Sequence, residues 1–155
     1  PELGVPPDSV DAVLARQTFF RYADKAALYR AVHAALRPGG DLLFTELMLA
    51  RPRPPGAELR RWMEGEAVHP WSLKQTTDQL QGVGFEVRVT AEVTADLRRL
   101  ILGAWARFAG DLTTGLDRRT AMAVLAEGEL WLRRLGLIDA GELIAYRVLA
   151  RKRSG

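Results

Sequence analysis

The fold is decided by two runs of sequence, DSVDAVLAR at residues 8–16 and LRPGGDLLFTE at residues 36–46. The first run is apolar at nearly every position from Val10, a pattern typical of a strand that is buried on both faces of a sheet. The second run leads into another apolar strand over residues 42–49. An amphipathic segment separates the two strands. This order predicts a β-α-β unit in which the two strands lie parallel.

The segment between the strands predicts a helix over residues 25–36, because Leu28 and Val32 belong to an apolar stripe at helical spacing. Asp24 precedes this helix and is placed to cap its first turn. The sequence Pro-Gly-Gly at residues 38–40 predicts the end of the helix and a turn, since proline interrupts helices and glycine adopts turn conformations freely.

The remainder of the chain is predicted to alternate between helices and strands. Ser72 and Gln75 fit a capping box at the start of one helix. Gly82 and Gly84 are predicted to end that helix, and Gly110 is predicted to end the next. A loop rich in proline and arginine is expected at residues 51–56. The predicted helices are at residues 57–64, 72–81, 94–109 and 117–135, and the predicted strands are at residues 85–89 and 142–150.

The last two strands differ in pattern. Residues 85–89 alternate apolar and polar side chains, which predicts one buried face and one solvated face. Residues 142–150 are apolar at positions that point to both faces. We therefore expect the final strand to lie deeper in the sheet than the strand before it.

Composition indicates one ordinary globular domain. The chain has 155 residues, 48% of them hydrophobic and 26% charged, with a net charge of +3 and no cysteine. A chain of this length supports one core, and the absence of cysteine fits a cytoplasmic protein without disulfides. No apolar run approaches the length of a membrane span. The arginine pairs lie within helical patterns, so a nucleic-acid-binding module is the least favoured interpretation.

These motifs resemble the middle of a class I S-adenosylmethionine-dependent methyltransferase. In that family an F-D-x-V strand and an L-(K/R)-P-G-G motif mark the fourth and fifth strands, and G-F-x-V opens the sixth. The corresponding sequences here are VDAV at residues 10–13, LRPGG at residues 36–40 and GFEV at residues 84–87. The resemblance implies an α/β fold, a partial Rossmann-like sheet that holds the fourth to seventh strands. The last strand is expected antiparallel between the fifth and sixth.

The resemblance also implies that the cofactor-binding half is absent from this chain. The family's glycine-rich loop lies upstream of these motifs, and no G-x-G-x-G follows a strand in this sequence. We therefore expect residues 1–155 to form the C-terminal part of a methyltransferase domain, with Pro1 at an internal position of a longer chain. The helices within residues 94–136 replace what is a short hairpin in many relatives. They would form an inserted helical hairpin that covers the substrate mouth or makes a dimer contact.

In an open α/β sheet the ligand lies beyond the carboxyl ends of the parallel strands. The loop after the first strand therefore carries the cofactor-binding candidates, Arg16, Gln17 and Phe20, which the resemblance associates with the methionine end of S-adenosylmethionine. Phe20 is equally well explained as core packing. Glu46, at the end of the second strand, is the catalytic candidate, as a proton acceptor or a partner for a cationic acceptor. The alternative for Glu46 is a polar strand end.

Three further residues are candidates for binding the acceptor substrate. Trp62, His69 and Trp71 follow the second strand, in a region that contributes to acceptor pockets in relatives, and aromatic rings there are suited to a methylated ammonium. Trp71 is also explained as a hydrophobic staple and His69 as a surface residue. No metal site is expected, because the chain has two histidines and no cysteine.

The function that follows is methyl transfer from S-adenosylmethionine to a small-molecule acceptor, with this chain supplying the acceptor side of the site and inactive alone. Methyl transfer requires alignment and exclusion of water, and a general base is optional, so no obligatory catalytic residue is expected. The alternative is a non-catalytic, self-associating fragment. Its homodimer would form through the unpaired strand at residues 10–16 or through the helical insertion. Neither a nucleic acid nor a membrane is an expected partner.

Overall fold

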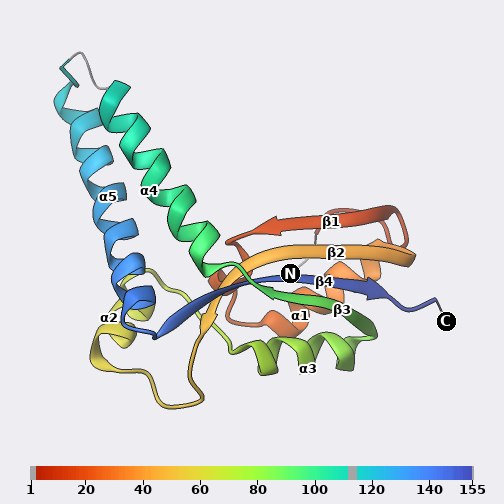
Figure 1. Cartoon of the computed structure of the whole chain (residues 1–155). Helices are drawn as coiled ribbons and strands as arrows, with labels where there is room; N and C mark the ends of the chain where they lie inside the picture. The colour runs from red at the N-terminus through yellow and green to blue at the C-terminus, as the bar shows by residue number, and fades with distance from the viewer. Residues whose placement is uncertain (1–2, 112–114, 155) are drawn as a thin grey trace.

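The computed structural model describes residues 3–111 and 115–154. Four strands form one open sheet in the order β1-β2-β4-β3 (Figure 1). β1 and β2 are parallel, and β4 is antiparallel to both of its neighbours, β2 and β3. The predicted insertion of the final strand is confirmed. The strands are β1 Val10–Arg16, β2 Leu36–Leu49, β3 Phe85–Glu92 and β4 Leu143–Lys152.

The helices occupy two separate places around this sheet (Figure 1). Two of them, α1 and α3, cover one face, and α4 and α5 form a hairpin that rises from one end of the sheet. The short α2 lies at the base of this hairpin, and a single 3-10 turn, η1, follows β1. The helical segments are η1 Phe19–Arg21, α1 Lys25–Ala35, α2 Ala57–Gly65, α3 Leu73–Val83, α4 Thr94–Asp111 and α5 Arg118–Asp139. Within the predicted insertion at residues 94–136, residues 112–114 lie outside the described part of the chain.

Local sequence determines several of these helix ends. The carboxylate of Asp24 accepts a hydrogen bond of 2.8 Å from the backbone N–H of Ala27, as the sequence predicts for a cap of α1. Ser72 and Gln75 form both halves of a capping box at the start of α3. Gly84 ends α3 at a φ of 111°, in the region that favours glycine. These three predictions are confirmed.

Two glycines predicted as helix ends lie inside helices instead. Gly82 is within α3, and α4 continues through Gly110 to Asp111. An isolated glycine weakens a helix by about 1 kcal/mol, a cost that does not by itself end a helix. Of the two glycines predicted to end α3, Gly84 therefore marks its end and Gly82 does not.

The Pro-Gly-Gly sequence interrupts strand pairing rather than separating α1 from β2 with a turn. α1 ends at Ala35 and β2 begins at the next residue. Val10 pairs with Leu36 but Ala12 pairs with Asp41, so residues 37–40 bulge out of the β1–β2 ladder. A Cβ added to Gly40 would lie 2.9 Å from the carbonyl oxygen of Arg37, a distance too short for any side chain. The bulge therefore requires glycine at this position.

The main core lies between the sheet and the two helices α1 and α3. Leu42, Phe44 and Met48 of β2 point to this side and are buried. Tyr29 of α1 packs near the ring of Phe44, with 6.3 Å between ring centroids. Phe85, at the start of β3, is also fully buried there. We call this side of the sheet the covered face.

The opposite side, which we call the open face, is largely free of helices (Figure 1). Leu14 of β1 is 75% exposed, and Val89 of β3 is exposed as well. The prediction that β1 is buried on both faces is wrong. Its ladder partner among the described residues is β2 alone, and α1 and α3 cover one face only. β1 is therefore an edge strand with one solvated side.

A second, smaller core fixes the helical hairpin to the end of the sheet. It joins Leu97 and Ile101 of α4 with Leu135 and Ile138 of α5, and Leu143 of β4 packs into the same cluster. Farther along, the outer side of α5 carries exposed apolar residues. Within residues 3–111 and 115–154, no helix combines the length and the apolar character that crossing a bilayer would require.

Candidate functional site

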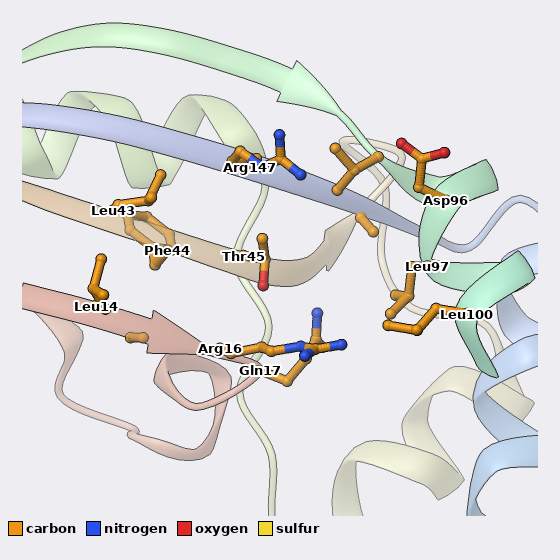
Figure 2. A pocket seen from close by; sticks show the side chains of 13 residues that line it. Leu14, Arg16, Gln17, Leu43, Phe44, Thr45, Asp96, Leu97, Leu100 and Arg147 are labelled. Atoms are coloured by element: carbon orange, nitrogen blue, oxygen red, sulfur yellow. The ribbon is translucent and has the colours of Figure 1, made fainter. Parts of the chain in front are cut away.

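A cavity of about 420 Å³ lies on the open face, at the carboxyl end of β1, over residues 43–45 of β2 and under the first turns of α4 (Figure 2). Its floor is formed by the three adjacent strands β1, β2 and β4, and its wall by α4. The walls are mainly apolar, with Leu14 and Leu43 from the sheet and Leu97 and Leu100 from the helix. Polar groups reach it from Arg16, Gln17, Thr45, Asp96 and Arg147.

Sheet register brings two arginines to this cavity. Arg16 of β1 pairs with Thr45 of β2, and Thr45 pairs with Arg147 of β4, so the three residues form one row across the sheet. Residues in such a row point to the same face. The side chains of Arg16 and Arg147 are both exposed, and Figure 2 shows them on opposite sides of Thr45. Arg147 was not a sequence-based candidate, because the register of an antiparallel strand is not visible in sequence.

Gln17 occupies a special position at the end of β1. Its backbone has a φ of 50°, unusual for a residue other than glycine. Its N–H donates a hydrogen bond of 2.8 Å to the carbonyl oxygen of Thr45, which fixes this conformation. The side-chain Oε1 of Gln17 is buried and has no hydrogen-bond partner among the described residues. A buried acceptor without a partner is costly, so this oxygen is suited to a donor from a ligand.

Glu46, the catalytic candidate, lies on the other side of the sheet. Its side chain is 4% exposed. One carboxylate oxygen accepts a hydrogen bond of 2.9 Å from the N–H of Phe20, and the other accepts one of 3.3 Å from the N–H of Leu47. Burial raises the pKa of Glu46 to about 7, against the opposing effect of these hydrogen bonds. The carboxylate therefore holds η1 against β2 and is not among the residues that line the cavity.

Lys25 is a buried charge that sequence reasoning missed. Its ammonium group donates hydrogen bonds to the carbonyl oxygens of Tyr22 and His69, and lies 5.0 Å from the centre of the Trp71 ring. Desolvation lowers the pKa of Lys25 to about 8, while the nearby charge of Glu46 opposes this shift. One signal was available: Lys25 lies on the same side of α1 as the apolar stripe, one turn before Leu28.

Two of the aromatic candidates lie in the interior. The rings of Phe20 and Trp62 stack with 6.0 Å between centroids, and both side chains are fully buried. The guanidinium of Arg134 on α5 lies 5.8 Å from the centre of the Phe20 ring. Neither Phe20 nor Trp62 lines the cavity under α4. Packing explains the position of both rings, while the indole Nε1 of Trp62 is buried without a hydrogen-bond partner among the described residues.

The other two acceptor candidates lie near Lys25. The side chain of His69 is exposed. The backbone N–H of His69 donates a hydrogen bond of 2.6 Å to the carbonyl oxygen of Phe20. Trp71 is partly buried and packs edge-on against Tyr29, with 6.4 Å between ring centroids. The structure thus brings Arg16 and Gln17 together at the cavity and places Trp62, His69 and Trp71 elsewhere. In the part of the chain that the structure describes, no group of three or more His, Cys, Asp or Glu side chains is placed to hold a metal ion.

Comparison with known proteins identifies the fold. No protein-family model and no curated protein sequence matches this chain. The phosphoethanolamine N-methyltransferase 2 of Haemonchus contortus, solved with S-adenosyl-L-methionine, matches at a TM-score of 0.81 and 20% identity, over 96% of this chain and 34% of that chain. A geranyl diphosphate C-methyltransferase from Streptomyces coelicolor A3(2) matches at 0.72 and 12%, over 97% of this chain and 49% of its own.

A third solved structure, the [4+2]-cyclase SpnF, matches at a TM-score of 0.70 and 22% identity, over 99% of this chain and 54% of that chain. The chain therefore has the fold of part of a class I methyltransferase, as the sequence motifs predict. It spans between one third and about half of the length of these three proteins.

Proposed function

We propose that this chain forms the acceptor side of an S-adenosylmethionine-dependent methyltransferase that acts on a small molecule. The observation that carries this proposal is the position of the cavity. It opens at the carboxyl end of the parallel strand β1, beside residues 43–45 of β2, near the edge where ligands bind in open α/β sheets. A volume of about 420 Å³ suits a small organic molecule rather than a macromolecule.

The residues at this cavity fit the methionine end of the cofactor. The unpartnered Oε1 of Gln17 is suited to accept a hydrogen bond from an ammonium group. When bound, S-adenosylmethionine would supply a methyl group on a positively charged sulfur. The part of this chain is then to orient the acceptor and to exclude water with the apolar side chains of Leu14, Leu97 and Leu100. Glu46 acts in this scheme as a positioning residue, because its carboxylate holds the turn after β1.

We further propose that the cofactor-binding half is supplied outside this chain and covers the open face. Two observations support this: the chain spans 34–54% of the three structural neighbours described above, and Leu14 at the edge of the sheet is 75% exposed. An apolar strand left at a sheet edge is a surface on which further structure packs. Without that half the chain would be inactive.

Calorimetric titration of S-adenosylmethionine into this chain tests the proposal. We expect no measurable binding to the chain alone, and binding at micromolar affinity or better once the cofactor-binding half is restored. Measuring whether the bound cofactor loses its methyl group then distinguishes a methyltransferase from a cyclase of the same fold. Tight binding to the chain alone would contradict the proposed division of the site. If the restored protein binds S-adenosylmethionine but transfers its methyl group to none of the acceptors tested, methyl transfer is contradicted.

A second candidate function, self-association without catalysis, is supported by the outer side of α5. Met122, Leu125 and Leu132 are 62%, 66% and 68% exposed and follow one another at spacings of three and seven residues. Such spacing forms a continuous helical stripe that is able to pair with its copy in a second chain. Analytical ultracentrifugation of Leu125→Glu and Leu132→Glu tests this candidate. A monomeric wild-type protein would contradict it.

A further inference from the structure

Building on the proposed function, we infer that the acceptor carries an anionic group, a carboxylate or a phosphate, that binds between Arg16 and Arg147 on the open face. The inference extends the proposed function, because it names the class of acceptor. It also moves Arg16 from the cofactor-binding set to the acceptor-binding set.

Register places the two guanidinium groups around one point. Arg16 and Arg147 flank Thr45 on the two neighbouring strands. Two inter-strand steps separate their backbones by roughly 10 Å. Arginine side chains reach several ångströms from the backbone, so both guanidinium groups are able to contact one anion placed above Thr45. The Thr45 hydroxyl lies between them and adds a hydrogen-bond donor (Figure 2).

Neither arginine has an ion-pair partner within residues 3–111 and 115–154, although several other arginines do. Arg151, on the same strand as Arg147, is held by the carboxylate of Asp41 at 2.8 Å. Arg30, also unpaired among the described residues, stands on the outer surface of α1, away from any second guanidinium in a shared cavity. Two like charges in one row repel each other, and an anion between them reverses that cost.

Among the residues that the structure describes, Asp96 on α4 is the acidic side chain that lines the cavity. Its carboxylate lies 3.4 Å from the guanidinium of Arg99, which partly neutralises it. The cavity therefore has a cationic floor and an apolar wall formed by Leu97 and Leu100. A molecule that fits has an anionic group at one end and an apolar body, and free inorganic ions lack the second feature.

Binding of simple probes to this chain tests the inference, with backbone amide NMR shifts as the readout. Octanoate has the required chemistry, and octanamide has the same body without the charge. We expect octanoate to bind with shifts at Arg16, Thr45 and Arg147, and octanamide to bind at least about tenfold more weakly. Octyl phosphate tests in the same way whether the anionic group is a phosphate.

Variants distinguish the specific contribution of the two arginines to binding from the effect of the protein's overall positive charge. Arg16→Gln and Arg147→Gln should each weaken octanoate binding by about tenfold, since each removes a charge-assisted hydrogen bond. Asp96→Asn should strengthen it by about twofold to threefold, because a repulsive carboxylate is removed. Arg30→Gln is the matched control and should have no effect. All three arginines are exposed, so these variants are expected to fold.

Three results would overturn the inference: no binding of octanoate or octyl phosphate, equal binding of octanamide, or equal effects of the Arg147 and Arg30 variants. Free methionine is the competing probe. If methionine displaces octanoate and depends on the same arginines more strongly, the anion is the cofactor's carboxylate and the assignment to the acceptor is wrong. These readouts do not require methyl transfer. If the anion site is present but the protein does not bind S-adenosylmethionine even with the cofactor-binding half restored, the proposed function is wrong and the anion site still stands.

Discussion

In its central part, at residues 43 and 44, β2 has similar apolar residues on its two faces, but they differ in burial. On the covered face Phe44 is almost completely buried against α1 and α3. On the open face its neighbour Leu43 is only partly buried and lines the cavity. Alternation along a strand sends these two residues to opposite sides, but it does not say which side receives helices. The comparison shows that the stable core and the candidate site use the two sides of one strand.

The largest expected effect on the free energy of unfolding comes from substitutions that test this difference in burial. Phe44→Ala should lower the free energy of unfolding by about 3–5 kcal/mol, because it leaves a cavity among the packed rings of Phe19 and Tyr29. The matched change on the open face, Leu43→Ala, should cost about 1 kcal/mol. Urea unfolding followed by circular dichroism measures both. Equal losses would mean that the two faces are equally packed.

The next largest effect is expected from breaking the buried ion pair that fixes the helical hairpin beside the open face. Arg134 and Glu66 lie 2.5 Å apart with side chains 5% and 9% exposed. Arg134→Met should cost about 3 kcal/mol, because it leaves the Glu66 carboxylate buried without its partner.

Two companion variants sharpen this prediction. The double variant Arg134→Met with Glu66→Gln should recover much of the loss, since no unpaired charge remains. Asp139→Asn removes an exposed ion pair with Arg98 on the same hairpin and should cost less than about 1 kcal/mol. If both single variants have the same effect, burial of the Arg134 pair contributes nothing to the anchoring of the hairpin.

A pH experiment examines Glu46, which binds the turn between the two faces. Because burial raises its pKa to about 7, the folded protein favours the protonated form. The stability gained from this preference is fully present below pH 4.5 and is lost as the pH rises through 7, by up to about 3 kcal/mol. Glu46→Gln should remove this dependence. Urea midpoints at pH 4.5 and 7.5 measure it, and the exposed Glu86→Gln is the control.

Lys25 contributes to the pH dependence of stability with the opposite sign and at higher pH. Its pKa is lowered to about 8, so its stabilising preference for the neutral form is lost as the pH falls from 10.5 through 8. Lys25 therefore contributes little between pH 4.5 and 7.5. His33 does titrate there, because burial lowers its pKa below 6.5, so the difference between the wild type and Glu46→Gln isolates Glu46. Equal pH dependence of the wild type and Glu46→Gln would contradict the burial of the carboxylate.

The smallest effect concerns a glycine that lets α3 pack on the covered face. Gly84 has a φ of 111°, and an added Cβ would lie 2.9 Å from Nε2 of His33. Gly84→Ala should cost about 1–2 kcal/mol. Gly82 lies inside α3 with open space around it, so Gly82→Ala should stabilise the protein by up to about 1 kcal/mol. Thermal unfolding that shows the same sign for both variants would refute the assignment.

Much of the fold could be predicted from sequence because its signals are local. Asp24, Ser72 and Gly84 act on backbone groups within four residues, so their effects follow from short motifs. The greater burial of the last strand followed from its apolar pattern. The candidate site was predicted less well. Arg16 and Gln17 reach the cavity because they follow a parallel strand, but Phe20 and Trp62 turned inward to stack on each other.

The sequence by itself determined the β-α-β unit, the helix caps, the deep final strand and the resemblance to a methyltransferase, since each depends on residues close together in the chain. Only the tertiary structure decided that Arg16, Thr45 and Arg147 form one row, that Leu43 lines a cavity while Phe44 is buried, and that Glu46 binds a turn rather than the cavity. These outcomes depend on strand register and on which face the helices cover. Both are set by contacts between residues as far apart as 110 positions, such as the paired Asp41 and Arg151, and no local pattern encodes them.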